Sequence, residues 1–390
     1  MMADSIEHVI TYWIIYQRYQ SPTLAGFAVI AHWVPFLVFS VYVGALADRF
    51  DPRRLIQIGL VLFMVASLGW AALILTDELR QWHAALLLVV HGLAGVFWAP
   101  VGQVLLHDIV KPAQLPSAVR LMATSRFLGL LLGPAVGSLL LVAVGPWGGL
   151  LINVLIYVPL FVWLIAAPYG PKFREGGDTP RNAVRGFADV WDTMRAVAGM
   201  PVILSMICLA GAASFFIGSA YQVQMPAYAA GLGAANDSVS YGLLLIANAS
   251  GAMVGGIILE WRGLLPPRPR TAFVLVGLWA LTLGGFAFTT NFYVGLVLLF
   301  IAGFLFLAYG AMTQALVQIH APPEIRGRVI GLYSMSALGL MTFSGITIGI
   351  GGSYVGVHWS LGASAMALLV FTMVLAPVTL RARTAVARET

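Results

Sequence analysis

The sequence predicts an all-α integral membrane protein with twelve transmembrane helices in two pseudo-symmetric six-helix bundles. Three observations predict this fold class. First, 60% of the 390 residues are hydrophobic, only 9% are charged, and the mean hydropathy is +0.91, whereas a soluble domain needs about 25% charged residues. Second, the apolar runs are long enough to cross about 30 Å of hydrocarbon as helices and too continuous for barrel strands. Third, a charged turn at residues 44–54 separates two such runs.

Apolar runs bounded by proline, glycine and charge mark the predicted spans. They lie near residues 6–18, 24–47, 54–76, 84–107, 117–143, 147–167, 200–228, 238–260, 271–289, 292–319, 329–350 and 357–380. A hydrophilic stretch divides them into six and six. We therefore expect an N-terminal six-helix bundle over 1–168, a cytoplasmic linker that can form an interfacial helix over 169–199, and a C-terminal six-helix bundle over 200–390.

The first predicted span is short. As a helix, residues 6–18 extend only about 20 Å. The sequence repeat described below places the start of this span about twelve residues before Met1. We therefore expect a truncated first helix, and a short tilted or re-entrant helix is the alternative.

Basic residues gather in the loops of one side. Of the 21 lysine and arginine residues, all except Arg18, Arg80 and Arg126 fall in the loops after even-numbered spans, within a few residues of those loops, or in the C-terminal tail. The positive-inside rule places these loops and both termini in the cytoplasm. We expect a monomeric, multi-pass protein of the bacterial cytoplasmic (inner) membrane, in contact with lipid. The net charge of +6 then reflects topology and not nucleic acid binding, because the basic residues form no continuous patch.

The two halves of the chain resemble each other at an offset of about 212 residues. Residues 44–49 align with residues 256–262, which pairs Asp48 with Glu260. The loop after the fourth span aligns with the loop after the tenth. Parallel halves of this kind place a substrate site near the membrane midplane, where they meet.

Three motifs resemble those of the major facilitator superfamily. Residues 44–54 (GALADRFDPRR) are similar to the signature loop between spans 2 and 3 of that family. Residues 322–329 (PPEIRGRV) are similar to its loop between spans 10 and 11, which is common in the branch with siderophore and macrolide exporters. A row in the fifth span is similar to its antiporter motif and consists of Gly129, Gly133, Pro134 and Gly137. Gly102 stands where many relatives carry a basic residue, so the coupling mechanism of those relatives does not carry over directly to this chain.

The resemblance implies that the two loops lock the cytoplasmic ends of the halves in one state and release them in another. The implied gating residues are Gly44, Asp48, Arg49, Arg53, Arg54, Glu324, Arg326 and Arg328. Independently of the family, the Asp48 carboxylate can accept hydrogen bonds from the N–H groups at a neighbouring helix start. The alternative for the arginines is a topology signal, and the alternative for the glycine row is close helix packing.

Ionisable side chains inside spans are rare and suggest function by default. Asp4, Glu7 and His8 are the predicted proton-coupling residues. Glu7 and His8 lie in the predicted span 6–18, and Asp4 would lie within the membrane in a first span of full length. Histidines change charge near neutral pH, so His32 and His91 are further candidates, although a packing role is the alternative for each.

Polar and aromatic residues of several spans predict a cavity for an amphipathic substrate. Aromatic rings would stack on the substrate and amides would orient it. The predicted cavity residues are Tyr12, His32, Trp33, Gln103, Arg126, Phe216, Tyr221, Gln222, Asn248, Tyr309 and Gln314. Packing or an interface position is the alternative for each aromatic residue.

These features favour a secondary active transporter that exports a small amphipathic molecule (a drug, siderophore or metabolite) in exchange for protons. A lipid or lysolipid translocator and a non-transporting membrane sensor or assembly partner are the alternatives. The sequence has no phosphate-binding loop, so we expect no ATP drive. Its histidines are scattered, and no metal-ligand cluster or nucleophile–base pair has suitable spacing, so we expect no enzyme activity, no cofactor and no metal.

Overall fold

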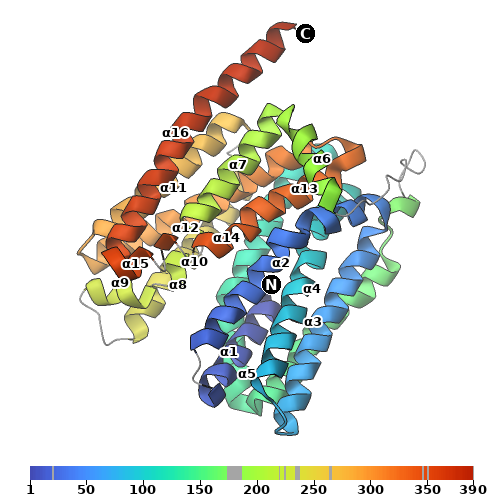
Figure 1. Ribbon diagram of the computed structural model, residues 1–390, viewed down its shortest axis with the longest axis vertical. Coiled ribbons are helices and arrows are strands. Elements are labelled where there is room, and N and C mark those ends of the chain that lie inside the picture. Colours follow the sequence, from blue (N-terminus) through green and yellow to red (C-terminus); the bar gives the residue numbers. More distant parts are fainter. Residues whose placement is uncertain are drawn as a thin grey trace. The chain divides into compact units, whose positions relative to one another are not determined.

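The computed structural model describes residues 1–19, 22–173, 187–218, 220–223, 225–232, 238–262, 266–344, 347–348 and 351–389. Every regular element in these ranges is helical, which confirms the predicted all-α fold class. Figure 1 shows the order of the helices along the chain.

The first half of the chain forms long helices and one short one. They are α1 (Met2–Tyr19), α2 (Pro22–Arg49), α3 (Pro52–Leu75), α4 (Gln81–Ile109), α5 (Leu115–Ala166) and α6 (Phe187–Ala198). α1 begins before the predicted span 6–18, so Asp4 lies inside a helix. α5 contains two predicted spans, which Gly145 separates because its φ of 74° is not helical.

The second half contains several shorter helices. They are α7 (Pro201–Phe216), α8 (Ala220–Val223), α9 (Met225–Gly231), α10 (Ser238–Arg262), α11 (Pro269–Phe288), α12 (Phe292–His320), α13 (Arg326–Ser334), α14 (Met341–Ser344), α15 (Gly351–Val355) and α16 (Val357–Glu389). Two predicted spans are interrupted. The span 200–228 is divided among α7, α8 and α9, where Gly218 has a φ of 49°. The span 329–350 contains a π-helical turn at Met335–Gly339 between α13 and α14.

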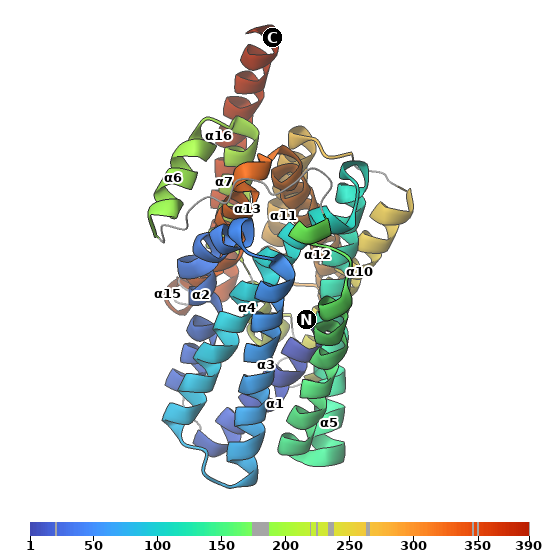
Figure 2. The same ribbon diagram turned by 90° about the vertical axis from the view of Figure 1, so that its right-hand side faces the viewer.

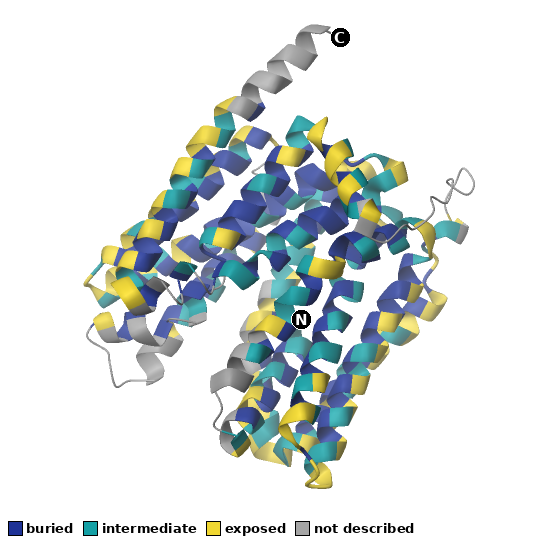
Figure 3. Ribbon diagram, in the orientation of Figure 1, coloured by how far each residue is buried: buried dark blue, intermediate teal, exposed yellow. Residues whose placement is uncertain are grey.

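Eight helices of the described residues are long and apolar enough to cross a membrane. One of them, α3, has a buried face and an exposed face, as the colours of Figure 3 show. Phe63 and Trp70 are buried, while an apolar stripe at helical spacing is exposed and consists of Ile58, Val61, Val65 and Leu68. A helix that is apolar on both faces suits a position between protein and lipid. The count of twelve spans is consistent with this fold and stays a prediction.

The described helices group into two compact units. The first unit comprises Met1–Lys111, Leu128–Val190 and Pro323–Met335, and the second comprises Pro112–Phe127, Trp191–Pro322 and Ser336–Thr390. Each unit therefore includes one short segment from the other half of the sequence. Both segments begin with a 3-10 turn, at Pro112–Gln114 and at Pro323–Ile325. The predicted domain boundaries after residues 168 and 199 stay a prediction.

In the first unit, α4 packs against α2 and α3, and α13 packs against α2. Figure 2 shows α3 and α4 joined by a short turn at one end of this unit. A cluster of buried apolar residues lies between α1, α2, α3, α4 and α5 and includes Ile6, Ile10, Trp70 and Leu150. Asp51 caps the N-terminus of α3 and is followed by Pro52 in the first helical position, the residue types expected at a helix start.

Candidate functional site

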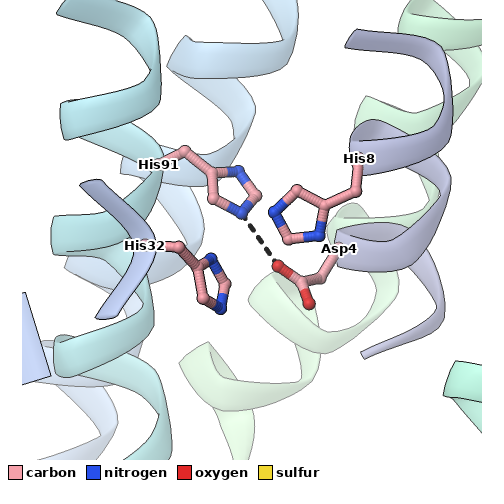
Figure 4. A group of neighbouring side chains, drawn as sticks. All are labelled: Asp4, His8, His32 and His91. Carbon is pink, nitrogen blue, oxygen red and sulfur yellow. Dashed lines mark hydrogen bonds and ion pairs between the residues drawn. The ribbon is translucent and has the colours of Figure 1, made fainter. Parts of the chain in front are cut away.

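A buried polar network in the first unit is centred on His91 of α4. Its Nε2 atom lies 2.8 Å from Oδ1 of Asp4, and its Nδ1 atom lies 2.8 Å from Oε1 of Glu7. The side chains of His91 and Glu7 are only 3% and 2% exposed. Figure 4 shows the His91–Asp4 contact as a dashed line. One imidazole therefore contacts two carboxylates away from water.

The network continues from Glu7 to α3 and α5. Oε2 of Glu7 accepts a hydrogen bond from the hydroxyl group of Ser67, and Nδ2 of Asn153 donates to Oγ of Ser67 at 3.2 Å. Ser67 and Asn153 are fully buried. The orientation of Glu7 therefore depends on the packing of four helices. Sequence reasoning missed Ser67, Asn153 and the central position of His91, and the available signal was a polar residue within an apolar run.

Three histidines converge on Asp4, as Figure 4 shows. The ring centroids of His8 and His91 are 4.8 Å apart, and those of His8 and His32 are 4.9 Å apart. One nitrogen of each histidine and one oxygen of Asp4 all lie within 4.8 Å of one another. The expectation that the histidines are scattered and form no metal-ligand cluster is therefore wrong. These residues come from three helices, with Asp4 and His8 on α1, His32 on α2 and His91 on α4, and helix packing brings them together.

The glycine row of α5 positions α1 for this cluster. A Cβ atom added to Gly133 would lie 2.4 Å from Cβ of Ser5, and one added to Gly129 would lie 2.8 Å from the backbone nitrogen of Met2. Gly137 faces α1 in the same way. Side chains larger than glycine at these positions would push α1 away, so the row serves close packing. The antiporter role that the family resemblance implies stays a prediction.

A second close approach brings two of the histidines together. A Cβ atom added to Gly92 would lie 1.9 Å from the carbonyl oxygen of Ala31. Helices α2 and α4 therefore meet backbone to backbone directly beside His32 and His91. This contact explains why two residues from different helices share one cluster.

Asp48 lies near the C-terminal end of α2, and its carboxylate contacts the start of α13. Its Oδ1 atom accepts a hydrogen bond from the backbone N–H of Gly327 at 2.5 Å, and its Oδ2 atom accepts one from the N–H of Arg328 at 3.1 Å. The first N–H groups of a helix have no partner within the helix and carry partial positive charge. A Cβ atom added to Gly44 would lie 2.1 Å from the carbonyl oxygen of Gly327. The α2–α13 contact therefore combines charge with close packing, and its gating role stays a prediction.

Two arginines of the same loop contact neighbouring groups of the first unit. Nη2 of Arg53 lies 2.7 Å from Oδ2 of Asp51, and its Nη1 donates to the carbonyl group of Ala167 at 2.6 Å. Nη1 of Arg54 donates to Oε1 of Gln57 at 3.0 Å. Arg53 thereby ties the start of α3 to the chain just after α5.

The pKa of Asp51 is lowered from its ordinary value of 3.8. Burial by itself raises this pKa, but the hydrogen bonds and positive charge of Arg53 outweigh burial. Asp51 is therefore held as a carboxylate, which also caps α3.

The other predicted gating residues lie at the end of α2 and at the start of α13. The guanidinium group of Arg49 lies 5.5 Å from the ring centroid of Phe50. Glu324 belongs to the 3-10 turn before α13, and Arg326 is the first residue of that helix. The side chains of Pro134 and Glu260 lie outside the described residues.

Some predicted cavity residues adjoin the histidine cluster. The ring of Tyr12 stacks on that of His8 with centroids 5.1 Å apart, and the ring of Trp33 meets that of His32 edge to face at 4.5 Å. Gln103 is buried further along α4.

Three other predicted cavity residues meet in the second unit. Oδ1 of Asn248 accepts hydrogen bonds from the hydroxyl group of Tyr221 and from Nε2 of Gln222, both at 3.2 Å. Its Nδ2 donates to the carbonyl group of Leu299 at 3.1 Å. A Cβ atom added to Gly303 would lie 1.8 Å from the carbonyl oxygen of Asn248, so α10 and α12 are in close contact here.

The remaining predicted cavity residues lie on several helices and belong to neither of these two groups. Tyr309 is buried with its ring centroid 5.0 Å from that of Trp279, which favours packing. Phe216 is the last residue of α7, Gln314 lies on α12, and Arg126 lies in the part of α5 that belongs to the second unit. The predicted set therefore divides between the units, and its convergence on one cavity stays a prediction.

Comparison with known proteins decides the family. The sequence model of the family described as Major Facilitator Superfamily matches residues 2–346. The chain belongs to the Major Facilitator Superfamily. The family resemblance stated from its three motifs is thereby confirmed.

Two relatives of this superfamily member align along most of its length. The multidrug efflux pump Tap of Mycolicibacterium fortuitum is 24% identical over 343 residues, covering 84% of this chain and 82% of that protein. Macrolide efflux protein A of Streptococcus pyogenes is 24% identical over 319 residues, covering 80% and 76%. Among solved structures, the E. coli fucose:proton symporter FucP aligns with a TM-score of 0.72 at 14% identity, over 97% of this chain and 96% of that one. That identity shows a shared fold alone.

Membership in the Major Facilitator Superfamily establishes the class of protein. The chain is a multi-pass membrane transporter for small molecules and not an enzyme. The predicted fold, transport class and absence of enzyme activity are confirmed at this level.

Proposed function

We propose that this transporter exports a small amphipathic molecule from the cytoplasm in exchange for protons, by alternating access. The observation that carries the proposal is that the two relatives above are efflux proteins by name and align along 84% and 80% of the chain. A drug, a siderophore or another secreted metabolite would be the substrate. The distribution of basic residues supports a place in the bacterial cytoplasmic membrane with both termini inside. We propose that the chain acts there as a monomer.

The network around His91 supports proton coupling. Ionisable groups within membrane helices commonly mark ion pathways. Asp4 and Glu7 contact opposite nitrogens of one imidazole, so a proton accepted at one nitrogen can be released from the other. We assign proton coupling to Asp4, Glu7 and His8, with His91 as the bridge between the carboxylates.

The α2–α13 contact supports the proposed gate. Asp48 comes from the first half of the sequence, and Gly327 and Arg328 come from the second half, so their hydrogen bonds join the two halves. Breaking two hydrogen bonds to a carboxylate costs a few kcal/mol. A proposed cycle would break this contact when the cytoplasmic side opens and form it again when that side closes.

Aromatic and amide groups support an amphipathic substrate. Trp33 and Tyr12 offer ring faces beside the proposed coupling site, and the cluster of Tyr221, Gln222 and Asn248 offers hydrogen-bonding groups in the second unit. Mixed lining of this kind binds small molecules by apolar contact and orients them by a few polar groups.

Reconstitution tests this proposal. The purified chain is placed in proteoliposomes, and transport of ethidium and of a radiolabelled macrolide is followed with and without a pH gradient. We expect gradient-driven transport that falls to background in Glu7→Gln and persists in Glu78→Gln, a matched change in an exposed turn.

The same experiment separates the alternatives. A transport rate that is unchanged after the pH gradient is collapsed would contradict proton coupling. Movement of a labelled lysolipid without movement of ethidium or the macrolide would replace export by lipid translocation. A folded protein that moves none of these probes would favour a sensor or assembly role.

A further inference from the structure

We propose that Asp4, His8, His32 and His91 bind one divalent transition-metal ion, for which Zn²⁺ is the best match. A metal site is a property separate from export. Its ion binding can be measured at fixed pH, without a substrate or a gradient.

The four ligand atoms already lie close together. One oxygen and three nitrogens fall within 4.8 Å of one another, as Figure 4 illustrates. Bonds of about 2.0–2.1 Å in a tetrahedral zinc site place the ligand atoms about 3.4 Å apart. Small side-chain rotations that separate the His91–Asp4 pair, now 2.8 Å apart, and draw the wider pairs together are therefore enough to fit an ion. Asp4 and His8 are one helical turn apart on α1, so one rigid element presents two of the four ligands.

The hydrogen bond between His91 and Glu7 is the second observation that indicates a metal. Metal-binding histidines usually donate the other ring N–H to a carboxylate, which fixes the tautomer and the ring orientation. Nδ1 of His91 lies 2.8 Å from Oε1 of Glu7. With the proton on Nδ1, Nε2 of His91 and Oδ1 of Asp4 are two acceptors only 2.8 Å apart, and a cation bound to both relieves their repulsion. Ser67 and Asn153 hold Glu7 in turn.

Charge and ligand type select the kind of ion. Buried carboxylates need a compensating positive charge, and a divalent cation balances both Asp4 and Glu7 while the histidines stay neutral. Three imidazole nitrogens with one carboxylate suit zinc and its neighbours, whereas Mg²⁺ and Ca²⁺ prefer oxygen ligands. The site is therefore expected to take Zn²⁺ or Co²⁺ in preference to Mg²⁺.

Calorimetric titration of the full chain with ZnCl₂, in detergent and without a histidine tag, tests the site. We expect one tightly bound ion per chain. His32→Gln and Asp4→Asn remove ligands and should weaken binding by more than the roughly 10- to 100-fold expected for Glu7→Gln, which removes only the supporting carboxylate. His83→Gln, a half-buried position on the same helix as His91 and outside the cluster, is the matched control and should bind as the unchanged chain does.

Two further measurements keep the test valid if a variant folds poorly. Zn²⁺ should raise the unfolding temperature of the unchanged chain and of His83→Gln, but not that of His32→Gln, because only an ion that binds the folded state stabilises it. Co²⁺ should give the visible absorption of a tetrahedral site in the unchanged chain. Equal Zn²⁺ affinity in His32→Gln and His83→Gln, or no binding by the unchanged chain, would overturn the proposal.

Discussion

At the scale of single residues, the proposed roles of His91 and Asp48 depend on the groups that their side chains contact. His91 contacts two carboxylates of α1, and Asp48 accepts two backbone N–H groups of α13. Both residues satisfy buried polar groups that would otherwise destabilise the fold. Such residues are therefore sensitive to small chemical changes that preserve their shape.

Asp48→Asn should destabilise the chain and reduce export. The substituted amide keeps the size of the side chain but places an NH₂ group against an N–H donor. We expect a loss of about 1–2 kcal/mol, since a carboxylate at a helix start contributes hydrogen bonds and favourable charge. Thermal unfolding in detergent measures the loss. Glu78→Gln, at an exposed position between α3 and α4, is the control, and equal unfolding temperatures for the two variants would contradict the expectation.

The Asp51–Arg53 ion pair should make stability depend on pH at the acidic end. The pKa of Asp51 is lower in the folded chain than its ordinary value of 3.8. A depressed carboxyl pKa stabilises the folded state above the unfolded-state pKa, and this stability is lost as the pH falls through the folded-state pKa. Asp51→Asn retains a capping residue but loses the ion pair. The unchanged chain should therefore unfold at a higher temperature than this variant at pH 6, and the difference should shrink below about pH 4. A difference that does not change with pH would contradict the assignment.

At the scale of helices, close backbone contacts determine which side chains meet. The glycine row of α5 brings α1 into the first unit, and Gly92 of α4 brings α2 close enough for His32 to reach His91. Small residues allow this because apolar attraction between helices is weak in lipid and association depends on close packing.

Gly92→Ala should disrupt the histidine cluster, whereas Gly102→Ala on the same helix should not. A methyl group at position 92 would lie 1.9 Å from the carbonyl oxygen of Ala31, and one at position 102 meets nothing within 4 Å. We expect Gly92→Ala to lose about 1–3 kcal/mol through overpacking. Gly102→Ala should be neutral or stabilising by up to about 1 kcal/mol, because alanine favours helix. Paired thermal unfolding curves measure both effects, and equal losses in the two variants would contradict the packing argument.

At the scale of the whole molecule, the two halves of the sequence each contribute a short segment to the other compact unit. Pro112–Phe127 and Pro323–Met335 occupy corresponding places in the sequence repeat, and both start with a 3-10 turn. Helices α4 and α12, which precede these segments, are each 29 residues long. The repeat seen in the loop motifs therefore extends to the order of elements.

Cysteine labelling tests the predicted membrane topology. After Cys208→Ser, single cysteines are introduced by Glu78→Cys in the turn between α3 and α4 and by Lys111→Cys in the loop between α4 and α5. Both positions are exposed. A membrane-impermeant maleimide should label position 78 in intact cells and position 111 only after permeabilisation. Labelling of both positions in intact cells would contradict the predicted orientation.

Much of the fold was predictable because it depends on local properties of the chain. The length of an apolar run and the charges that flank it are read directly from consecutive residues, so they indicate helices, membrane spans and the ends of those spans without any knowledge of packing. The motifs at residues 44–54 and 322–329 likewise consist of consecutive residues, so the family resemblance is visible without the fold. The breaks in α7–α9 and the π turn after α13 escaped prediction, because the apolar pattern continues through them.

The sequence by itself determined that this protein is a helical membrane transporter of one superfamily. Only the tertiary structure decided that Asp4, His8, His32 and His91 form one cluster and that Asp48 contacts the start of α13. The physical reason is that these contacts depend on how far each helix is rotated and how closely two backbones approach. Those quantities are set by glycines such as Gly92 and Gly44 on neighbouring helices, and no hydropathy pattern records them.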